Sequence, residues 1–97
     1  MSVLIDLAIF PTDKGESVSS YVASAVSIIK GSGLAYNFGP MGTAIEGEWD
    51  EVLSVVHCCF EELKKESNRI YMTIRLDYRK NKTGRIKTKV KSVEEKL

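Results

Sequence analysis

The sequence predicts an α+β fold of the ferredoxin-like type: a βαββαβ sandwich with a four-stranded antiparallel sheet and an additional C-terminal helix. An apolar run over residues 3–10 and a strict alternation of apolar and polar residues over 68–79 predict two long strands. Between them lie two stretches with helical spacing, separated by a glycine-rich reversal. The 97 residues are 43% hydrophobic and 28% charged, which is typical of a single globular domain spanning residues 1–97.

The first strand and the first helix follow from two different apolar patterns. Residues 3–10 (VLIDLAIF) are apolar at nearly every position, as expected for a central strand that is covered on both faces. Residues 17–30 then carry an apolar stripe at spacings of three and four, which predicts a helix with Ser17 as its cap. Gly31 and Gly33 are expected to end this helix.

A hairpin and a second helix are predicted next. Residues 34–38 and 43–46 are short strand-like runs, and the Gly39-Pro40-Met41-Gly42 segment between them favours a tight reversal. Negative charge at residues 48, 50 and 51 complements the positive end of a helix dipole. The helix that begins there is expected to bury the apolar side chains of Trp49, Val52, Leu53, Val56, Phe60 and Leu63.

The last third of the chain predicts a strand followed by a helix. Residues 68–79 alternate almost perfectly, with Tyr71 among the polar residues of one face and five apolar side chains on the other face: Ile70, Met72, Ile74, Leu76 and Tyr78. After a loop, four apolar residues recur at spacings of four, three and four, which predicts an amphipathic helix with a basic outer face: Ile86, Val90, Val93 and Leu97.

This order of elements predicts self-association. Right-handed crossovers place the first two helices on one face of the sheet. The opposite face is then expected to be uncovered, although Leu4, Ala8 and Phe10 point toward it. Because a large exposed apolar patch is unusual for a monomer, we expect a homo-oligomer that packs sheet to sheet, as a dimer or a dimer of dimers.

The charge of the chain is divided along its length. Residues 1–63 hold two bases and nine acids, for a net charge of −7, whereas residues 64–97 hold twelve bases and four acids, for a net charge of +8. The basic part could bind nucleic acid through residues 79–91. We favour the alternative that the two halves interleave in the fold or meet across a subunit interface, because the aromatic and glycine pattern of RNA-recognition motifs is missing.

Several function classes are excluded by the motifs that the sequence lacks. His57 and Cys58 are sequence neighbours and would lie about 100° apart on a helix, so they do not form a metal or nucleophile site. No glycine-rich phosphate loop is present. The adjacent Cys58 and Cys59 exclude a disulfide scaffold, and residues 1–10 lack the features of a signal peptide. We therefore expect a cytoplasmic protein without a metal, cofactor or membrane span.

The candidate site is the hairpin with its flanks, at Tyr36, Asn37, Phe38, Thr43 and Glu46. Aromatic faces attract positive charge, and a carboxylate accepts hydrogen bonds from an exocyclic amine, so this set suits a flat nitrogen heterocycle. The alternative is that the aromatic residues fill core and interface space while Glu46 pairs with a base such as Arg75.

The same hairpin resembles the thiamine-binding-protein family. The resemblance rests on residues 33–36 (GLAY), 39–47 (GPMGTAIEG) and 49–52 (WDEV), with further likeness at 74–79 and 89–97. It implies a ferredoxin-like fold, assembly as dimers of dimers through the sheets, and non-catalytic binding of thiamine or its hydroxymethylpyrimidine moiety. It also implies a site at Tyr36, Asn37, Thr43 and Glu46, with Asp77 as a weaker candidate.

Two departures from the family pattern bear on the ligand. Residues 11–16 differ from the usual start of the loop after the first strand, and bases are unusually dense over residues 79–91. The extra bases could recognise a phosphorylated form of the vitamin. The main alternative function is a structural or regulatory homo-oligomer that binds another small metabolite, and a nucleic-acid binder ranks below it.

Overall fold

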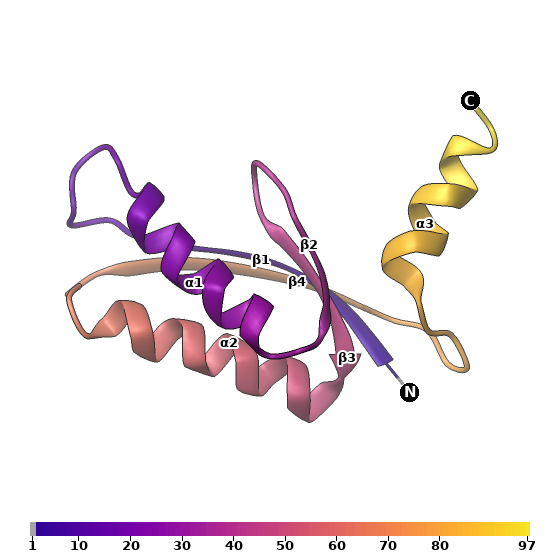
Figure 1. The fold of residues 1–97 in the computed structure, drawn as a ribbon, viewed down its shortest axis with the longest axis horizontal. Coiled ribbons are helices and arrows are strands. Elements are labelled where there is room, and N and C mark those ends of the chain that lie inside the picture. Colours follow the sequence, from indigo (N-terminus) through magenta and orange to yellow (C-terminus); the bar gives the residue numbers. More distant parts are fainter. Residues whose placement is uncertain (1) are drawn as a thin grey trace.

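The computed structural model describes residues 2–97 and confirms the α+β, ferredoxin-like fold with its C-terminal helix (Figure 1). Its strands form one antiparallel sheet in the order β2-β3-β1-β4. None of the helices within residues 2–97 has the length and apolar character needed to cross a membrane. The elements are β1 Ser2–Pro11, α1 Ser19–Gly31, β2 Ala35–Phe38, β3 Thr43–Glu48, α2 Trp49–Lys64, β4 Ile70–Tyr78 and α3 Arg85–Glu94.

The hydrophobic core lies between the sheet and the helices α1 and α2, which lie side by side along the sheet (Figure 1). Every second residue of β1 faces these helices and is buried, whereas the residues between them are half-buried on the other face. Ile5 lies opposite Ile45 of β3 and Leu76 of β4, so these three side chains point to the helical face. The side of the sheet that carries α1 and α2 is called the helical face below, and the other side the open face.

The start of α1 differs from the prediction. The helix begins at Ser19 with Val18 as its cap, no side chain caps it, and Ser17 lies in the preceding loop. This loop is held by Asp13 instead, whose carboxylate accepts hydrogen bonds from the Ser67 hydroxyl at 2.6 Å and the Asn68 amide at 2.7 Å. The loop therefore uses the chain entering β4 as its support, a long-range contact that a local capping pattern does not reveal.

The acidic start of α2 is confirmed in detail. Glu48 and Glu51 form a capping box in which the Glu51 carboxylate accepts a hydrogen bond from the Glu48 amide at 3.3 Å. The buried side chains of α2 are not the whole predicted set, because Trp49 is 53% exposed while Val55 and Cys59 are buried.

The open face is partly covered, which corrects the expectation that it is bare. The helix α3 begins on this face, where it contacts β3 and β2, and then leads away from the body of the molecule (Figure 1). Within α3 only Arg85 is buried, and residues 87–97 are exposed. The amphipathic pattern predicted a helix correctly, but in the single chain its apolar stripe has almost nothing to pack against.

Candidate ligand-binding site

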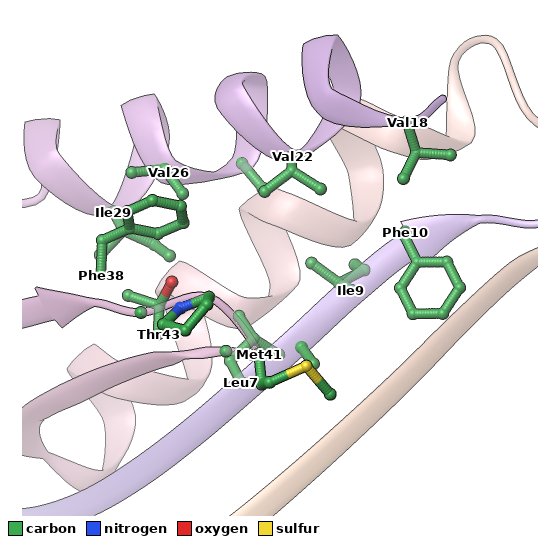
Figure 2. Close-up of a pocket in the computed structure, with 15 residues that line it drawn as sticks. Leu7, Ile9, Phe10, Val18, Val22, Val26, Ile29, Phe38, Met41 and Thr43 are labelled. Atoms are coloured by element: carbon green, nitrogen blue, oxygen red, sulfur yellow. The ribbon is translucent and has the colours of Figure 1, made fainter. Parts of the chain in front are cut away.

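A cavity of about 270 Å³ lies between α1, the C-terminal half of β1 and the β2–β3 hairpin (Figure 2). Figure 2 shows the valines of α1 on one side, the residues of β1 on another, and Phe38, Met41 and Thr43 of the hairpin closing the third. Its lining residues are Leu7, Ala8, Ile9, Phe10, Val18, Val22, Ala25, Val26, Ile29, Phe38, Gly39, Pro40, Met41, Gly42 and Thr43.

The wall from α1 follows from helical spacing. Val18, Val22 and Val26 recur every fourth residue and are half-buried, beside the fully buried Ala25 and Ile29. The apolar stripe of α1 is wide enough that its buried residues pack on the core while its half-buried valines face the cavity. The spacing of these residues predicted a helix but not a cavity wall, so the valines are candidate-site residues that were not predicted from the sequence.

The wall from the hairpin depends on its tight turn. The Gly39 amide donates a hydrogen bond to the Gly42 carbonyl oxygen at 2.9 Å, which closes the reversal. A Cβ atom on Gly42 would lie 2.8 Å from a carboxylate oxygen of Asp6, so a larger residue here would displace the Asp6 side chain, which is paired with Arg75. The turn holds Phe38, which is 57% exposed, and Met41, which is 86% exposed, at the rim of the cavity.

The cavity is apolar and carries no charge. None of its lining residues ionises, and the Thr43 hydroxyl is its polar side-chain group. Thr43 is only 4% exposed. Apolar walls, an aromatic ring and a single hydroxyl are the features of a pocket for a flat, largely uncharged ring.

The six residues predicted for the site are divided between the two faces of the sheet. Tyr36 lies opposite Ile45 and Phe38 opposite Thr43, all on the helical face, although Tyr36 packs against the core and does not line the cavity. The other three lie on the open face: Asn37, Glu46 and Asp77. Because side chains alternate along a strand, one hairpin supplies both groups, and one ligand on one face of this chain cannot contact all six.

On the open face Glu46 holds the start of α3. It is 6% exposed, and its carboxylate accepts hydrogen bonds from the Arg85 amide at 3.0 Å, the Ile86 amide at 3.3 Å and the Ser2 hydroxyl at 3.1 Å. A carboxylate in this position also complements the positive end of the helix dipole. The alternative pairing with Arg75 is not formed, because Arg75 donates to Asp6 at 2.7 Å instead.

Asp77 provides a second attachment for α3. Its carboxylate accepts hydrogen bonds from the Lys89 ammonium at 2.6 Å and from the Arg85 guanidinium. These two interactions lower the pKa of Asp77 to about 2. The Arg85 side chain is buried, and its Nη1 is the one buried side-chain nitrogen or oxygen in residues 2–97 without a partner. We call Glu46, Asp77, Arg85 and Lys89 the α3 anchor.

The histidine and cysteines of α2 do not form a reactive centre. Cys59 is fully buried and donates to the Ala25 carbonyl oxygen at 3.5 Å, and burial raises the pKa of its thiol to about 11. His57 and Cys58 are exposed. No group of three or more histidine, cysteine or acidic side chains suited to a metal ion occurs in the described part of the chain.

Comparison with known proteins identifies relatives over the whole length of the chain. The family model described as thiamine-binding protein matches residues 5–94. A UPF0045 protein of Synechocystis is 37% identical over 95 residues, which cover 97% of this chain and 78% of that protein. A UPF0045 protein of Methanocaldococcus jannaschii is 32% identical over 93 residues, which cover 96% of this chain and 93% of that protein.

Solved structures agree with the fold at high similarity. The crystal structure of that Methanocaldococcus jannaschii protein superposes with a TM-score of 0.90, covering 97% of each chain. A Thermotoga maritima protein, described as a candidate thiamine biosynthesis or salvage protein, superposes with a TM-score of 0.85 at 22% identity, covering 96% of this chain and 99% of that one. The apolar cavity and the hairpin signature thus occur in a chain that belongs to the thiamine-binding protein family.

Proposed function

We propose that this protein binds thiamine, or its hydroxymethylpyrimidine moiety, in the cavity between α1 and the β2–β3 hairpin. One observation carries the proposal: residues 39–43 (GPMGT), the most specific part of the family resemblance, form a wall of the cavity. The match of the family model to residues 5–94 supports a ligand related to thiamine. Residues 79–91 lie outside the cavity lining, so the dense bases there give no support for a phosphate subsite in it.

The chemistry of the cavity favours the pyrimidine end of the vitamin. The aminopyrimidine is flat and uncharged at neutral pH, whereas the thiazolium carries a positive charge that the apolar lining does not neutralise. Phe38 offers a ring for stacking, and the buried Thr43 hydroxyl offers one hydrogen bond to the exocyclic amine or a ring nitrogen. In this arrangement the thiazolium remains at the open rim, next to Met41.

The proposal includes a role in binding rather than in catalysis. General acid–base and nucleophilic catalysis need an ionisable or activated group next to the reacting atoms. The cavity lining offers a single hydroxyl, from Thr43, and no base beside it to remove its proton. We infer that the protein buffers or presents its ligand in the cytoplasm.

Self-association through the open face is part of the same proposal. Leu4, Ala8 and Phe10 are half-buried on this face, and Tyr71, which stacks near Phe10 with 5.7 Å between ring centroids, is 55% exposed. A second copy packed on this area would bury these side chains. The carboxylates of Asp6 and Asp77 are already paired within the chain, so the charges there do not oppose such packing.

Titration calorimetry with hydroxymethylpyrimidine, thiamine, thiamine phosphate and thiamine diphosphate tests the proposal. We expect binding of the first two with similar affinity, and little change on phosphorylation, because the cavity has no group that recognises phosphate. Absence of heat from all four compounds at millimolar concentration would contradict the proposal. A different small molecule retained by the oligomer in native mass spectrometry would favour the alternative, a homo-oligomer that binds another metabolite.

A further inference from the structure

The edge strand β4 exposes an apolar strip on the helical face of the sheet. Ile74 and Leu76 are each 42% exposed and Tyr78 is 49% exposed, although register places them beside the buried Leu7, Ile5 and Val3 of β1. The cause is that the main contacts of α1 and α2 with the sheet are made to β1, β2 and β3, while on β4 the residues that pack against the core are Ile70 and Met72 in its N-terminal half. We call Ile74, Leu76 and Tyr78 the β4 strip.

The helix α3 carries an apolar stripe that packs against almost nothing else in residues 2–97. Val90 is 52% exposed, Val93 is 60% exposed, and Leu97, in the turn after the helix, is 95% exposed. The α3 anchor attaches only the N-terminal half of α3 to the body of the protein. Helices of ten residues are marginal in water unless an apolar face is packed, so we expect the stripe of α3 to be covered in the assembled protein.

The apolar stripe of α3 cannot pack on the β4 strip of its own chain. Glu46 attaches α3 to the open face, whereas the β4 strip lies on the helical face, with the sheet between them. The helix of another copy has no such restriction. The lengths of α3 and the β4 strip are also similar, since α3 extends about 15 Å and the strip about 13 Å.

Charge supplies a second reason to choose another copy as the partner. Lys87 lies on the exposed flank of α3, whereas Lys89 is already paired with Asp77 and Lys91 with Glu95 in the same chain. The exposed surface of α2 carries the acidic side chains Asp50 and Glu61. Lys87 and these acidic side chains lie on opposite faces of the sheet in one chain, so they can pair between copies rather than within one.

We propose that α3 of one copy packs its Val90, Val93 and Leu97 side chains over the β4 strip of a second copy, and that the second copy does the same in return. This contact is separate from packing of the open faces, and it completes the helical layer over β4.

Disulfide trapping between two singly substituted chains tests this contact directly. One chain carries Val93→Cys and the other Leu76→Cys, each with Cys58→Ser to remove the exposed native thiol. After mixing and mild oxidation, we expect a covalent heterodimer at a yield about tenfold above that of the control pair, Val93→Cys with Tyr71→Cys on the open face. A heterodimer formed only by the control pair, or by neither pair, would overturn the proposal.

A charge placed in the stripe gives a second readout that does not depend on disulfide geometry. Sedimentation at about 0.1 mM protein should show that Val93→Glu halves the mass of the assembly. The matched variant Thr88→Glu adds the same charge on the opposite side of α3 and should leave the mass unchanged. Equal masses for both variants, with circular dichroism showing that each is folded, would refute the contact, as would a wild-type protein that is monomeric.

Discussion

The cavity on the helical face and the α3 anchor on the open face are built by the same hairpin from opposite kinds of residue. The cavity takes Phe38 and Thr43 and contains no ionisable group. The anchor takes Glu46, three residues further along the same strand, and surrounds it with hydrogen-bond donors. The sequence of this hairpin therefore meets two separate structural requirements. Its residues on the helical face form an apolar pocket, and Glu46 on the open face attaches α3.

This contrast also separates the expected roles of the two faces. On the helical face, packing of carbon atoms sets both stability and the shape of the cavity. On the open face, hydrogen bonds to the buried Glu46 carboxylate and the half-exposed Asp77 carboxylate position a helix that has little apolar contact of its own. Substitutions on each face should therefore change different measured properties.

The largest effect is expected for Ile29→Ala in the wall of the cavity. Ile29 is 1% exposed and belongs to the core as well as to the cavity lining, so its truncation should lower the free energy of unfolding by about 3 kcal/mol in a urea titration. Val26→Ala, at a half-buried position in the same wall, should cost about 1 kcal/mol. Equal losses of unfolding free energy in the two variants would contradict the larger contribution of Ile29 to the core.

A smaller loss of stability is expected for Glu46→Gln on the open face. The amide keeps one acceptor but loses the charge that attracts the first turn of α3, so we expect a cost of about 2 kcal/mol and a loss of helical circular dichroism. Affinity for the cavity ligand should not change. Weaker ligand binding by Glu46→Gln with α3 intact would instead show that Glu46 contacts the ligand. Glu61→Gln, on the exposed surface of α2, removes the same charge elsewhere and serves as the control.

Phe38→Ala should change binding more than stability. The side chain is 57% exposed at the rim of the cavity, so its removal should lower ligand affinity about tenfold with little effect on unfolding. Tyr71→Ala is a matched control, because Tyr71 is an aromatic residue of β4 on the other face with 55% exposure. Comparable loss of affinity in both variants would place the ligand outside the cavity.

The smallest effect concerns the pH dependence of the α3 anchor. Hydrogen bonds from Lys89 and Arg85 lower the pKa of Asp77 from its ordinary value of 3.8 to about 2 in the folded protein. Its contribution to stability is therefore present above the ordinary carboxyl pKa and is lost as the pH falls through about 2. The stability difference between the wild type and Asp77→Asn should stay constant from neutral pH down to about 5 and shrink below 4. A difference that changes near neutral pH would contradict this assignment.

Much of the fold could be predicted because its signals are local. Alternation identified β4, helical spacing identified all three helices, and the acidic cap of α2 was visible at Glu48 and Glu51. The predicted start of α1 at Ser17 was wrong, because the preceding loop is held by contacts of Asp13 with residues more than fifty positions away. The attachment of α3 by Glu46 is likewise a contact between distant segments that no local pattern contains.

The candidate site was predictable only in part. The hairpin was identified from its composition, and Phe38 and Thr43 do line the cavity. The hairpin pattern and the family resemblance grouped Asn37, Glu46 and Asp77 with them, but the strand register places these three side chains on the opposite face of the sheet. The valines of α1 were missed because a half-buried apolar stripe looks the same whether it meets a core or a cavity.

The position of the ligand is the measurement that tests the central claim most directly. Backbone amide shifts of ¹⁵N-labelled protein can be followed by nuclear magnetic resonance while hydroxymethylpyrimidine is added. We expect saturable shifts around the cavity, at Val22, Phe38 and Thr43, with the α3 anchor unaffected. Shifts concentrated at Asn37, Glu46 and Asp77 instead would place the ligand on the open face and contradict the account.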